Sequence, residues 1–344
     1  MPASPSAAQL TVLMPYGTSA QSNPYLTELV ASLRPYCSVV RFSWRQALLG
    51  RYDVFHVHWP EYLLRGSTWP RTQVRRALMA MSLLRMQLGR IPIVRTMHNA
   101  KPHDAPSSIE RLLLAWFDRL TVVGIRINEI DETPEGWVGR TIRHGDYRNW
   151  VSSVRVDEAI PGRLVLVGQL RAYKNAPDLI NCFRQLPDSE VSLLIAGKPF
   201  DAAVKTAIVD AAAGDARVEC TLEFLDDQVL ATAVSTAELV VLPYAEMGNS
   251  GAALLALSCG RPVLVPNTDI NQALAAEVGS DWVMTYEGPL TAVALRNAAT
   301  RAAKLTGEPD LSNRDWADAG PLHAAAYRAA ICVRRGQDPA SVAT

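Results

Sequence analysis

Residues 240–265, VVLPYAEMGNSGAALLALSCGRPVLV, decide the fold class of this chain. The segment starts with an apolar, β-branched run, continues through a polar, glycine-rich loop at 243–251 and then becomes apolar over a helical length. A second β-branched run, 262–265, closes it. A buried strand, a loop, a helix and another buried strand form a βαβ unit, so the segment predicts a parallel sheet covered by helices.

The loop in this segment has the chemistry of a phosphate site. It brings Glu246, Asn249, Ser250 and the amide of Gly251 to the start of the expected helix. Free N–H groups and the positive end of the helix dipole favour a phosphate there. An acidic residue just upstream can accept hydrogen bonds from ribose or sugar hydroxyls. The arrangement indicates a nucleotide-sugar site.

Short apolar strands alternate with helical stretches along the whole chain. A polar stretch, 151–162, interrupts the alternation once, so we expect an α/β fold with two consecutive parallel sheets joined near residue 155. The expected strands are 10–14, 38–42, 54–58, 91–97, 120–123, 141–143, 163–167, 191–196, 218–220, 239–242, 262–265 and 282–285. The expected helices are 24–33, 71–88, 108–116, 176–185, 202–214, 226–236, 252–258, 271–278, 290–304 and 315–333.

Size and composition fit a folded protein of two domains. The chain has 344 residues, of which 49% are apolar and 20% charged. Its five cysteines are scattered without CxxC spacing, which is typical of reduced thiols in a cytosolic protein. The first nine residues lack a basic signal region, and no run of 18 apolar residues occurs. These features predict a cytoplasmic protein without a membrane span.

The net charge of zero conceals an asymmetry. Residues 1–150 contain 18 Lys and Arg against 11 Asp and Glu, a net +7, and the remainder carries −7. Opposed charges support two domains, and a basic half can face an anionic surface. A chance distribution of solvated charges explains the same counts. We expect no nucleic-acid partner.

Ligands of open α/β sheets bind outside the carboxyl ends of the strands, so the loops after the strands carry the candidate site. The loop after the first expected strand contains Gly17, Thr18 and Asn23, and it is followed by a helix that starts with Pro24. This loop suits an anion, or it simply caps the helix. It lacks the GxGxxG spacing of a dinucleotide site.

Two further loops that follow strands in the first half of the chain carry titratable and aromatic side chains. His58, Trp59 and Glu61 follow one strand, and His98 and Asp104 follow the next. His58 and Trp59 suit stacking and hydrogen bonding to an acceptor sugar, and His98 suits the donor sugar. Glu61 and Asp104 are rival candidates for the general base, because a carboxylate in a cleft can deprotonate a hydroxyl. Glu61 equally suits the start of a helix.

A metal site is not expected. His56 and His58 share one face of a strand, which permits metal binding, but no third ligand stands at a fixed spacing. We therefore predict no metal and no cofactor.

The second half offers two cations after its first strand. Gly168, Arg171 and Lys174 lie in a loop just before a helix start with Pro177. Two cations three residues apart can neutralise a diphosphate, although solvated surface charges are the alternative.

The helix at 71–88 differs in kind, because it is apolar with arginines at both ends. Such a helix can lie on an anionic membrane surface. A helix packed on the N-terminal sheet is the commoner explanation, and both remain open.

With these residues in view, the chain resembles the GT-B superfamily of nucleotide-sugar glycosyltransferases over most of its length. It also looks like the bacterial exopolysaccharide β-mannosyltransferases of the xanthan type. The match rests on FHVHWPE at 55–61, TMHN at 96–99, GQLRAYK at 168–174 and PYAEMGNSGAALLALSCGRPV at 243–263.

The resemblance implies two Rossmann-like domains whose parallel sheets face each other across a cleft. It implies an acceptor-side domain at 1–155, a donor domain at 156–315 and a terminal helix within 316–344 that returns to the first domain. Arg171 and Lys174 would contact the diphosphate. Glu246 matches the first acid of the retaining E-x7-E motif, but the second position is Leu254. This departure favours an inverting enzyme, and the missing DxD-type motif implies that no divalent ion is needed.

The expected function is transfer of a sugar from a nucleoside diphosphate to a glycolipid or oligosaccharide acceptor. GDP-mannose is the donor that the resemblance suggests. Gly17, Thr18, Gly168, Arg171, Lys174, Glu246, Asn249, Ser250 and Gly251 are the expected donor site, and Asn23, His58 and Trp59 the acceptor site. A nucleotide-sugar epimerase and a non-catalytic glycan- or nucleotide-binding subunit are the alternatives.

Overall fold

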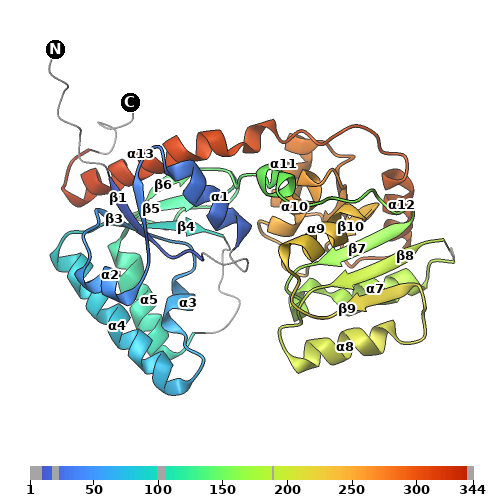
Figure 1. Ribbon diagram of the computed structural model, residues 1–344, viewed down its shortest axis with the longest axis horizontal. Helices are drawn as coiled ribbons and strands as arrows, with labels where there is room; N and C mark the ends of the chain where they lie inside the picture. The colour runs from blue at the N-terminus through green and yellow to red at the C-terminus, as the bar shows by residue number, and fades with distance from the viewer. Residues whose placement is uncertain (1–9, 18–22, 99–105, 188–189, 339–344) are drawn as a thin grey trace, which may run out of the picture. The chain divides into compact units, whose positions relative to one another are not determined.

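The computed structural model describes residues 10–17, 23–98, 106–187 and 190–338. The chain divides into two compact units (Figure 1). One consists of residues 1–145 together with 315–344, and the other of residues 146–314. The assignment of acceptor and donor roles to these parts of the chain stays a prediction.

The first unit contains, in its described part, a parallel sheet of six strands in the order β2-β1-β3-β4-β5-β6. The strands are β1 (Thr11–Met14), β2 (Ser38–Arg41), β3 (Val54–Val57), β4 (Ile93–Met97), β5 (Thr121–Arg126) and β6 (Val138–Thr141). The helices are α1 (Pro24–Leu33), α2 (Trp44–Leu49), α3 (Pro60–Leu64), α4 (Trp69–Leu88), α5 (Ser108–Leu120) and α13 (Trp316–Arg334).

Helices cover both faces of this sheet, which explains why the central strands β1 and β3 are buried on both sides. α1 and α13 contact each other on one face, and α13 also contacts β3, β4 and β5 (Figure 1). On the other face, α4 and α5 pack against β3 and β4 through Leu83, Phe117 and Phe55, which are fully buried. Each such side chain contributes about 1.5–3 kcal/mol by leaving water.

The second unit repeats the plan with the strand order β12-β11-β10-β7-β8-β9, again parallel throughout the described residues. Its strands are β7 (Arg163–Val167), β8 (Ser192–Ala196), β9 (Val218–Thr221), β10 (Leu239–Val241), β11 (Val263–Pro266) and β12 (Val283–Tyr286). Its helices are α6 (Arg148–Ser152), α7 (Ala176–Arg184), α8 (Ala202–Ala212), α9 (Asp227–Ser235), α10 (Gly251–Ser258), α11 (Asp269–Val278) and α12 (Ala292–Ala302), with single 3-10 turns at Ala172–Lys174 and Ser312–Arg314.

In each sheet the strand order reverses at one point, although all strands run parallel. In the first sheet the reversal lies between β1 and β3, and in the second between β7 and β10. A crevice opens outside the carboxyl ends of strands where the order reverses. The loops that follow these four strands are among those for which the sequence predicts ligand chemistry.

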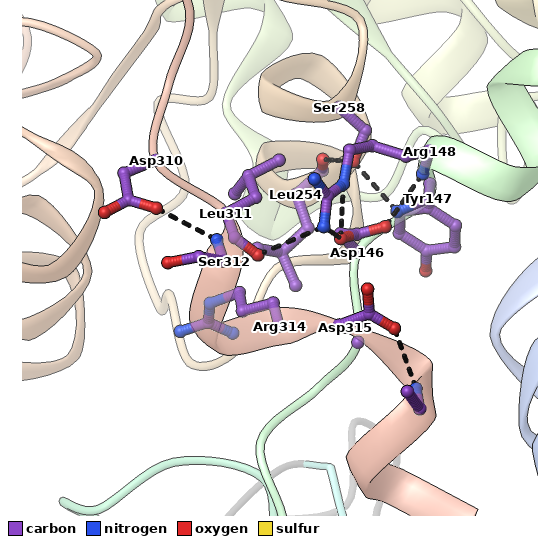
Figure 2. Close-up of polar contacts among 12 residues, drawn as sticks. Asp146, Tyr147, Arg148, Leu254, Ser258, Asp310, Leu311, Ser312, Arg314 and Asp315 are labelled. Carbon is purple, nitrogen blue, oxygen red and sulfur yellow. Dashed lines mark hydrogen bonds and ion pairs between the residues drawn. The ribbon is translucent and has the colours of Figure 1, made fainter.

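The two ends of the second unit lie side by side, as Figure 2 shows. The amide of Asp146 donates to the carbonyl of Arg314 at 2.9 Å. The Arg148 guanidinium bonds the buried Asp146 carboxylate at 2.6 Å. The amide of Tyr147 donates to the Ser258 hydroxyl at 2.8 Å. These bonds fix the short helix α6 against α10, whose first residue belongs to the predicted phosphate loop.

The α/β fold and the alternation of strands and helices are confirmed. The predicted strand 141–143 is wrong in its bounds, because β6 ends at Thr141. Helices α2, α3 and α6 are absent from the prediction because five or six residues give no readable helical period.

Candidate active site

Two glycines shape the first loop of the second unit, directly after β7. Gly168 has φ of +107°, a conformation that side chains rarely adopt. A Cβ on Gly197 would lie 1.9 Å from the carbonyl oxygen of Gly168. The loops after β7 and β8 therefore approach more closely than any residue with a side chain would allow.

Arg171 and Lys174 follow this glycine along the chain, and each packs against an aromatic ring. The Arg171 guanidinium lies 4.1 Å from the centre of the Phe200 ring, and the Lys174 ammonium lies 4.9 Å from that of Tyr244. Lys174 is buried, and this burial lowers its pKa to about 8. Within the described residues, neither cation forms an ion pair with a carboxylate. A buried ammonium without a counter-ion is costly, so the arrangement suits an anionic ligand.

The second loop, after β10, ends at a capped helix start. The Ser250 hydroxyl accepts a hydrogen bond from the amide of Ala253 at 3.3 Å, which makes Ser250 the N-cap of α10. Gly251 is the first residue of the helix, and a Cβ there would lie 3.1 Å from the Tyr147 hydroxyl. Glu246 is exposed in the loop, and Asn249 is partly buried. Leu254 is buried in α10, where a retaining motif would place its second acid.

The lowered pKa of Lys174 predicts that nucleotide binding depends on pH. We expect the affinity for GDP to stay constant up to about pH 8 and then to fall up to about tenfold per pH unit, because only the protonated ammonium attracts the diphosphate. Diphosphate binding should raise the pKa of Lys174, so we expect protein and nucleotide together to take up protons in this range. Titration calorimetry across the range measures both effects. In Lys174→Arg the dependence should disappear, because arginine stays charged; an unchanged dependence would assign the titration to another group.

The first unit brings together aromatic and imidazole rings at the ends of β3 and β4. His58 Nδ1 and His98 Nε2 lie 2.9 Å apart in a hydrogen bond. The Trp59 ring stacks on His98, with 4.3 Å between the ring centres. Tyr25, in the first turn of α1, packs edge-on against both histidines. Burial lowers the pKa of His58 and His98 well below the ordinary value, so both rings are neutral at pH 7.

A second layer of hydrogen bonds lies two residues earlier on each strand. His56 Nδ1 bonds the Tyr327 hydroxyl of α13, and its Nε2 bonds the Thr96 hydroxyl, both at 2.8 Å. His56 is thereby occupied on both nitrogens. In the part of the chain that the structure describes, no three His, Cys, Asp or Glu side chains are placed to hold a metal ion.

The remaining predicted residues of the first unit differ in how far the structure describes them. Asn23 is the N-cap of α1, because its Oδ1 accepts from the amide of Tyr25 at 3.0 Å. Gly17 is exposed after β1. Glu61 lies in the first turn of α3 and lines a groove with Arg95 and Met97 of β4. Thr18 and Asp104 lie outside the described residues.

Several side chains of these sites escape prediction from the sequence. Phe200 and Tyr244, which hold the two cations, come from loops after β8 and β10. Tyr147, beside Gly251, lies just before the polar stretch 151–162, where the sequence indicates only a linker. Aromatic residues just after strands were the available signal, but only the tertiary fold pairs them with their partners.

Several solved structures share this fold. The structure aligns with Anabaena HepE in complex with UDP-glucose at a TM-score of 0.61, with 14% sequence identity and coverage of 97% of both chains. It also aligns with sucrose-phosphate synthase from Thermosynechococcus elongatus at 0.56 and 15% identity, over 95% of this chain and 97% of that one. The two units with their parallel sheets thus form the GT-B fold.

The sequence shows the family. Residues 161–299 match the family described as glycosyl transferases group 1. The chain is 43% identical over 329 residues to a GDP-mannose:glycolipid 4-beta-D-mannosyltransferase of Xanthomonas campestris pv. campestris, covering 95% of this chain and 94% of that protein. This chain therefore belongs to the group 1 glycosyl transferases, and it is a glycosyltransferase. The alternatives of an epimerase or a silent binding subunit are not favoured.

Proposed function

We propose that this enzyme transfers mannose from GDP-mannose to the saccharide of a glycolipid, with inversion at the anomeric carbon and without a metal ion. The relationship to the Xanthomonas mannosyltransferase over nearly the whole chain is the observation that carries this proposal. Mannose is α-linked in GDP-mannose, so a β-linked product requires attack from the opposite face of the sugar. The buried Leu254 supports this proposal, because a retaining motif would place an acid there.

The reaction needs one base and one stabiliser for the leaving group. The acceptor oxygen bonds to the anomeric carbon while the bond to the GDP phosphate breaks, and GDP leaves with the electron pair. Glu61 or Asp104 takes the hydroxyl proton. Arg171, Lys174 and the amides at 249–251 stabilise the departing diphosphate, which is the part that a metal ion plays in other transferases. His98 and Glu246 hold the donor sugar, and Asn23, His58 and Trp59 contact the acceptor.

A panel of nucleotides tests the donor assignment. Bound ligand raises the apparent thermal stability of a protein, so GDP and GDP-mannose are expected to raise the midpoint of unfolding. UDP, CDP and ADP at the same concentration should leave it nearly unchanged. A shift with UDP that equals or exceeds the shift with GDP would contradict the choice of GDP-mannose.

We also propose that α4 docks on an anionic membrane on the cytoplasmic side, where the glycolipid acceptor lies. One side of this helix packs on the first sheet, since Met79, Leu83 and Met86 belong to the core. Its opposite side carries an apolar stripe at alternating spacings of three and four: Val74, Ala77, Met81, Leu84 and Leu88, all exposed. Among the described residues, no helix is both long and apolar enough to cross a membrane.

The surroundings of this stripe favour a lipid surface over a second protein. Trp69, at the start of α4, is 74% exposed, and exposed tryptophans suit the level of lipid headgroups. Arg71 and Arg90 are exposed near the two ends of the helix. Leu112 of the neighbouring helix α5 is 70% exposed. Apolar side chains bordered by arginine are the pattern of an interfacial helix.

Replacing Met81 and Leu88 together by glutamate should lower binding to phosphatidylglycerol-containing vesicles about tenfold or more, because each buried apolar side chain contributes about 1.5–3 kcal/mol. Vesicle co-sedimentation measures the bound fraction. The matched control replaces Val209 and Val293, exposed apolar residues of the second unit, by glutamate. Equal vesicle binding by both double variants, or a change in oligomeric state without vesicle binding, would contradict membrane docking.

A further inference from the structure

A groove of about 780 Å³ lies wholly within the first unit, between β4, α5 and the crossover from β5 to β6. Met97, Leu114 and Trp137 are apolar residues that line it. The volume is within the range of small-molecule sites. The groove extends from the amino end of β5, at Thr121, to Glu61 beside the carboxyl end of β3. It therefore runs along the flank of the sheet and ends at a candidate general base.

The wall that carries Trp137 is held in place before any ligand arrives. The indole N–H donates to the carbonyl of Asp118 at 3.1 Å. The ring packs directly on β5, because a Cβ on Gly124 would lie 3.0 Å from Trp137 Cε3. The crossover itself turns on the Asn128 side chain, whose Oδ1 accepts from the amides of Ile130 and Asp131 at 2.7 Å each. A rigid aromatic wall of this kind loses little entropy on binding.

One ion pair and several further charged side chains line the groove. Arg95 Nη1 bonds Asp118 Oδ1 at 2.8 Å, with side chains 25% and 45% exposed. Asp118 accepts this bond with a pKa that burial raises above its ordinary value. Further carboxylates line the groove at Glu61, Asp131, Glu132 and Glu135, against one more cation, Arg119.

This charge pattern selects the ligand class. Five carboxylates against two guanidinium groups repel phosphate, so neither a nucleotide nor a lipid diphosphate suits the groove. Among the described residues, these carboxylates form no group of three that could hold a metal ion. Neighbouring hydroxyls of a neutral sugar can donate to carboxylates and accept from guanidinium, while the C–H face of the sugar ring packs on an indole. We propose that the groove binds the neutral sugar units of the acceptor that lie behind the reacting sugar.

The proposal rests on the proposed function, since it gives the glycolipid's saccharide a defined place. It adds Arg95, Asp118 and Trp137 as acceptor-binding residues. The sequence does not predict them, because none of them directly follows a strand. The groove volume of about 780 Å³ has room for more than one sugar ring. Specificity for the acceptor then depends on sugars that take no part in the reaction.

Fluorine NMR of the full chain labelled with 5-fluorotryptophan tests this proposal. The eight tryptophans give eight signals, and Trp137→Phe identifies the one that belongs to Trp137. Cellotriose, maltotriose and mannotriose serve as neutral probes at millimolar concentration. We expect at least one of them to move the Trp137 signal with saturation, and GDP to leave that signal in place. A Trp137 signal that none of the three trisaccharides moves would overturn the groove.

A matched pair of variants separates the charge pair from general destabilisation. Asp118→Asn should weaken trisaccharide binding about tenfold, the change that 1.4 kcal/mol produces. Asp281→Asn removes a similar ion pair to Arg301, at 2.7 Å in the second unit, and should leave trisaccharide binding unchanged. Equal affinity in both variants would remove Asp118 from the site. The thermal shift by GDP is measured on the same samples. A GDP shift without trisaccharide binding contradicts only the proposal that the groove binds sugars. Trisaccharide binding without a GDP shift contradicts only the proposed donor.

Discussion

Replacing Lys174 by methionine is expected to lower kcat/KM for GDP-mannose about a hundredfold to a thousandfold. The ammonium is buried beside Gly168 and Tyr244 and has no carboxylate partner among the described residues. In this environment a charge acts on a neighbouring diphosphate with little screening by water. Methionine keeps the length and apolar contacts of the side chain. The double variant with Arg171→Ala should lose still more, and GDP affinity should fall with it, since hydrogen bonds to charged groups contribute about 1.5–3 kcal/mol.

Two measurements distinguish a loss of diphosphate stabilisation from misfolding of the variant. The thermal midpoint of Lys174→Met should not fall, because methionine removes the cost of burying a charge. Lys205→Met, on the exposed side of α8, changes the same charge away from the loop and should leave GDP affinity unaltered. If calorimetry finds the GDP affinity of the Arg171 and Lys174 double variant unchanged, these cations do not belong to the donor site.

The second large effect concerns the base. We expect either Glu61→Gln or Asp104→Asn to lower kcat about a hundredfold or more, because general-base catalysis contributes about 10²–10⁴. Both substitutions keep the shape of the side chain and remove its ability to accept the acceptor proton. GDP binding should be retained in both, since the expected loss occurs in the chemical step. Steady-state rates and GDP calorimetry on the same preparations test this together.

The outcome for Glu61 also separates two roles. If Glu61 is the base, Glu61→Gln lowers kcat and changes the dependence of kcat on pH. If Glu61 only lines the groove, Glu61→Gln raises KM for the acceptor and leaves kcat unchanged. Full activity in both Glu61→Gln and Asp104→Asn would remove both carboxylates from the mechanism and with them the proposed path of the proton.

The sequence predicts the parts of the candidate site that follow directly from strand periodicity. Apolar β-branched runs define the strands, and parallel strands end at one edge of their sheet. Arg171, Lys174 and Ser250 follow β7 and β10, and the order of the second sheet reverses between these two strands. His58 and His98 likewise follow adjacent strands, which is why their imidazoles meet.

The parts that could not be predicted depend on contacts between distant residues. The crossover at 127–137 has no helical or strand period, and the indole of Trp137 is seated only because Gly124, on β5, leaves room for it. Helix α4 is apolar on two opposite sides, so its sequence supports both packing and an exposed surface. Only the fold assigns Met79 to the core and Met81 to the exterior.

The anomeric configuration of the product tests the central claim most directly. Purified enzyme, GDP-mannose labelled with ¹³C at the anomeric carbon and a lipid extract that contains the acceptor give a labelled glycolipid, whose one-bond carbon–hydrogen coupling distinguishes α from β linkage. The account predicts mannose transfer with a β linkage. An α-linked product would mean retention and contradict the role assigned to Leu254, and transfer from another nucleotide sugar in place of GDP-mannose would contradict the donor.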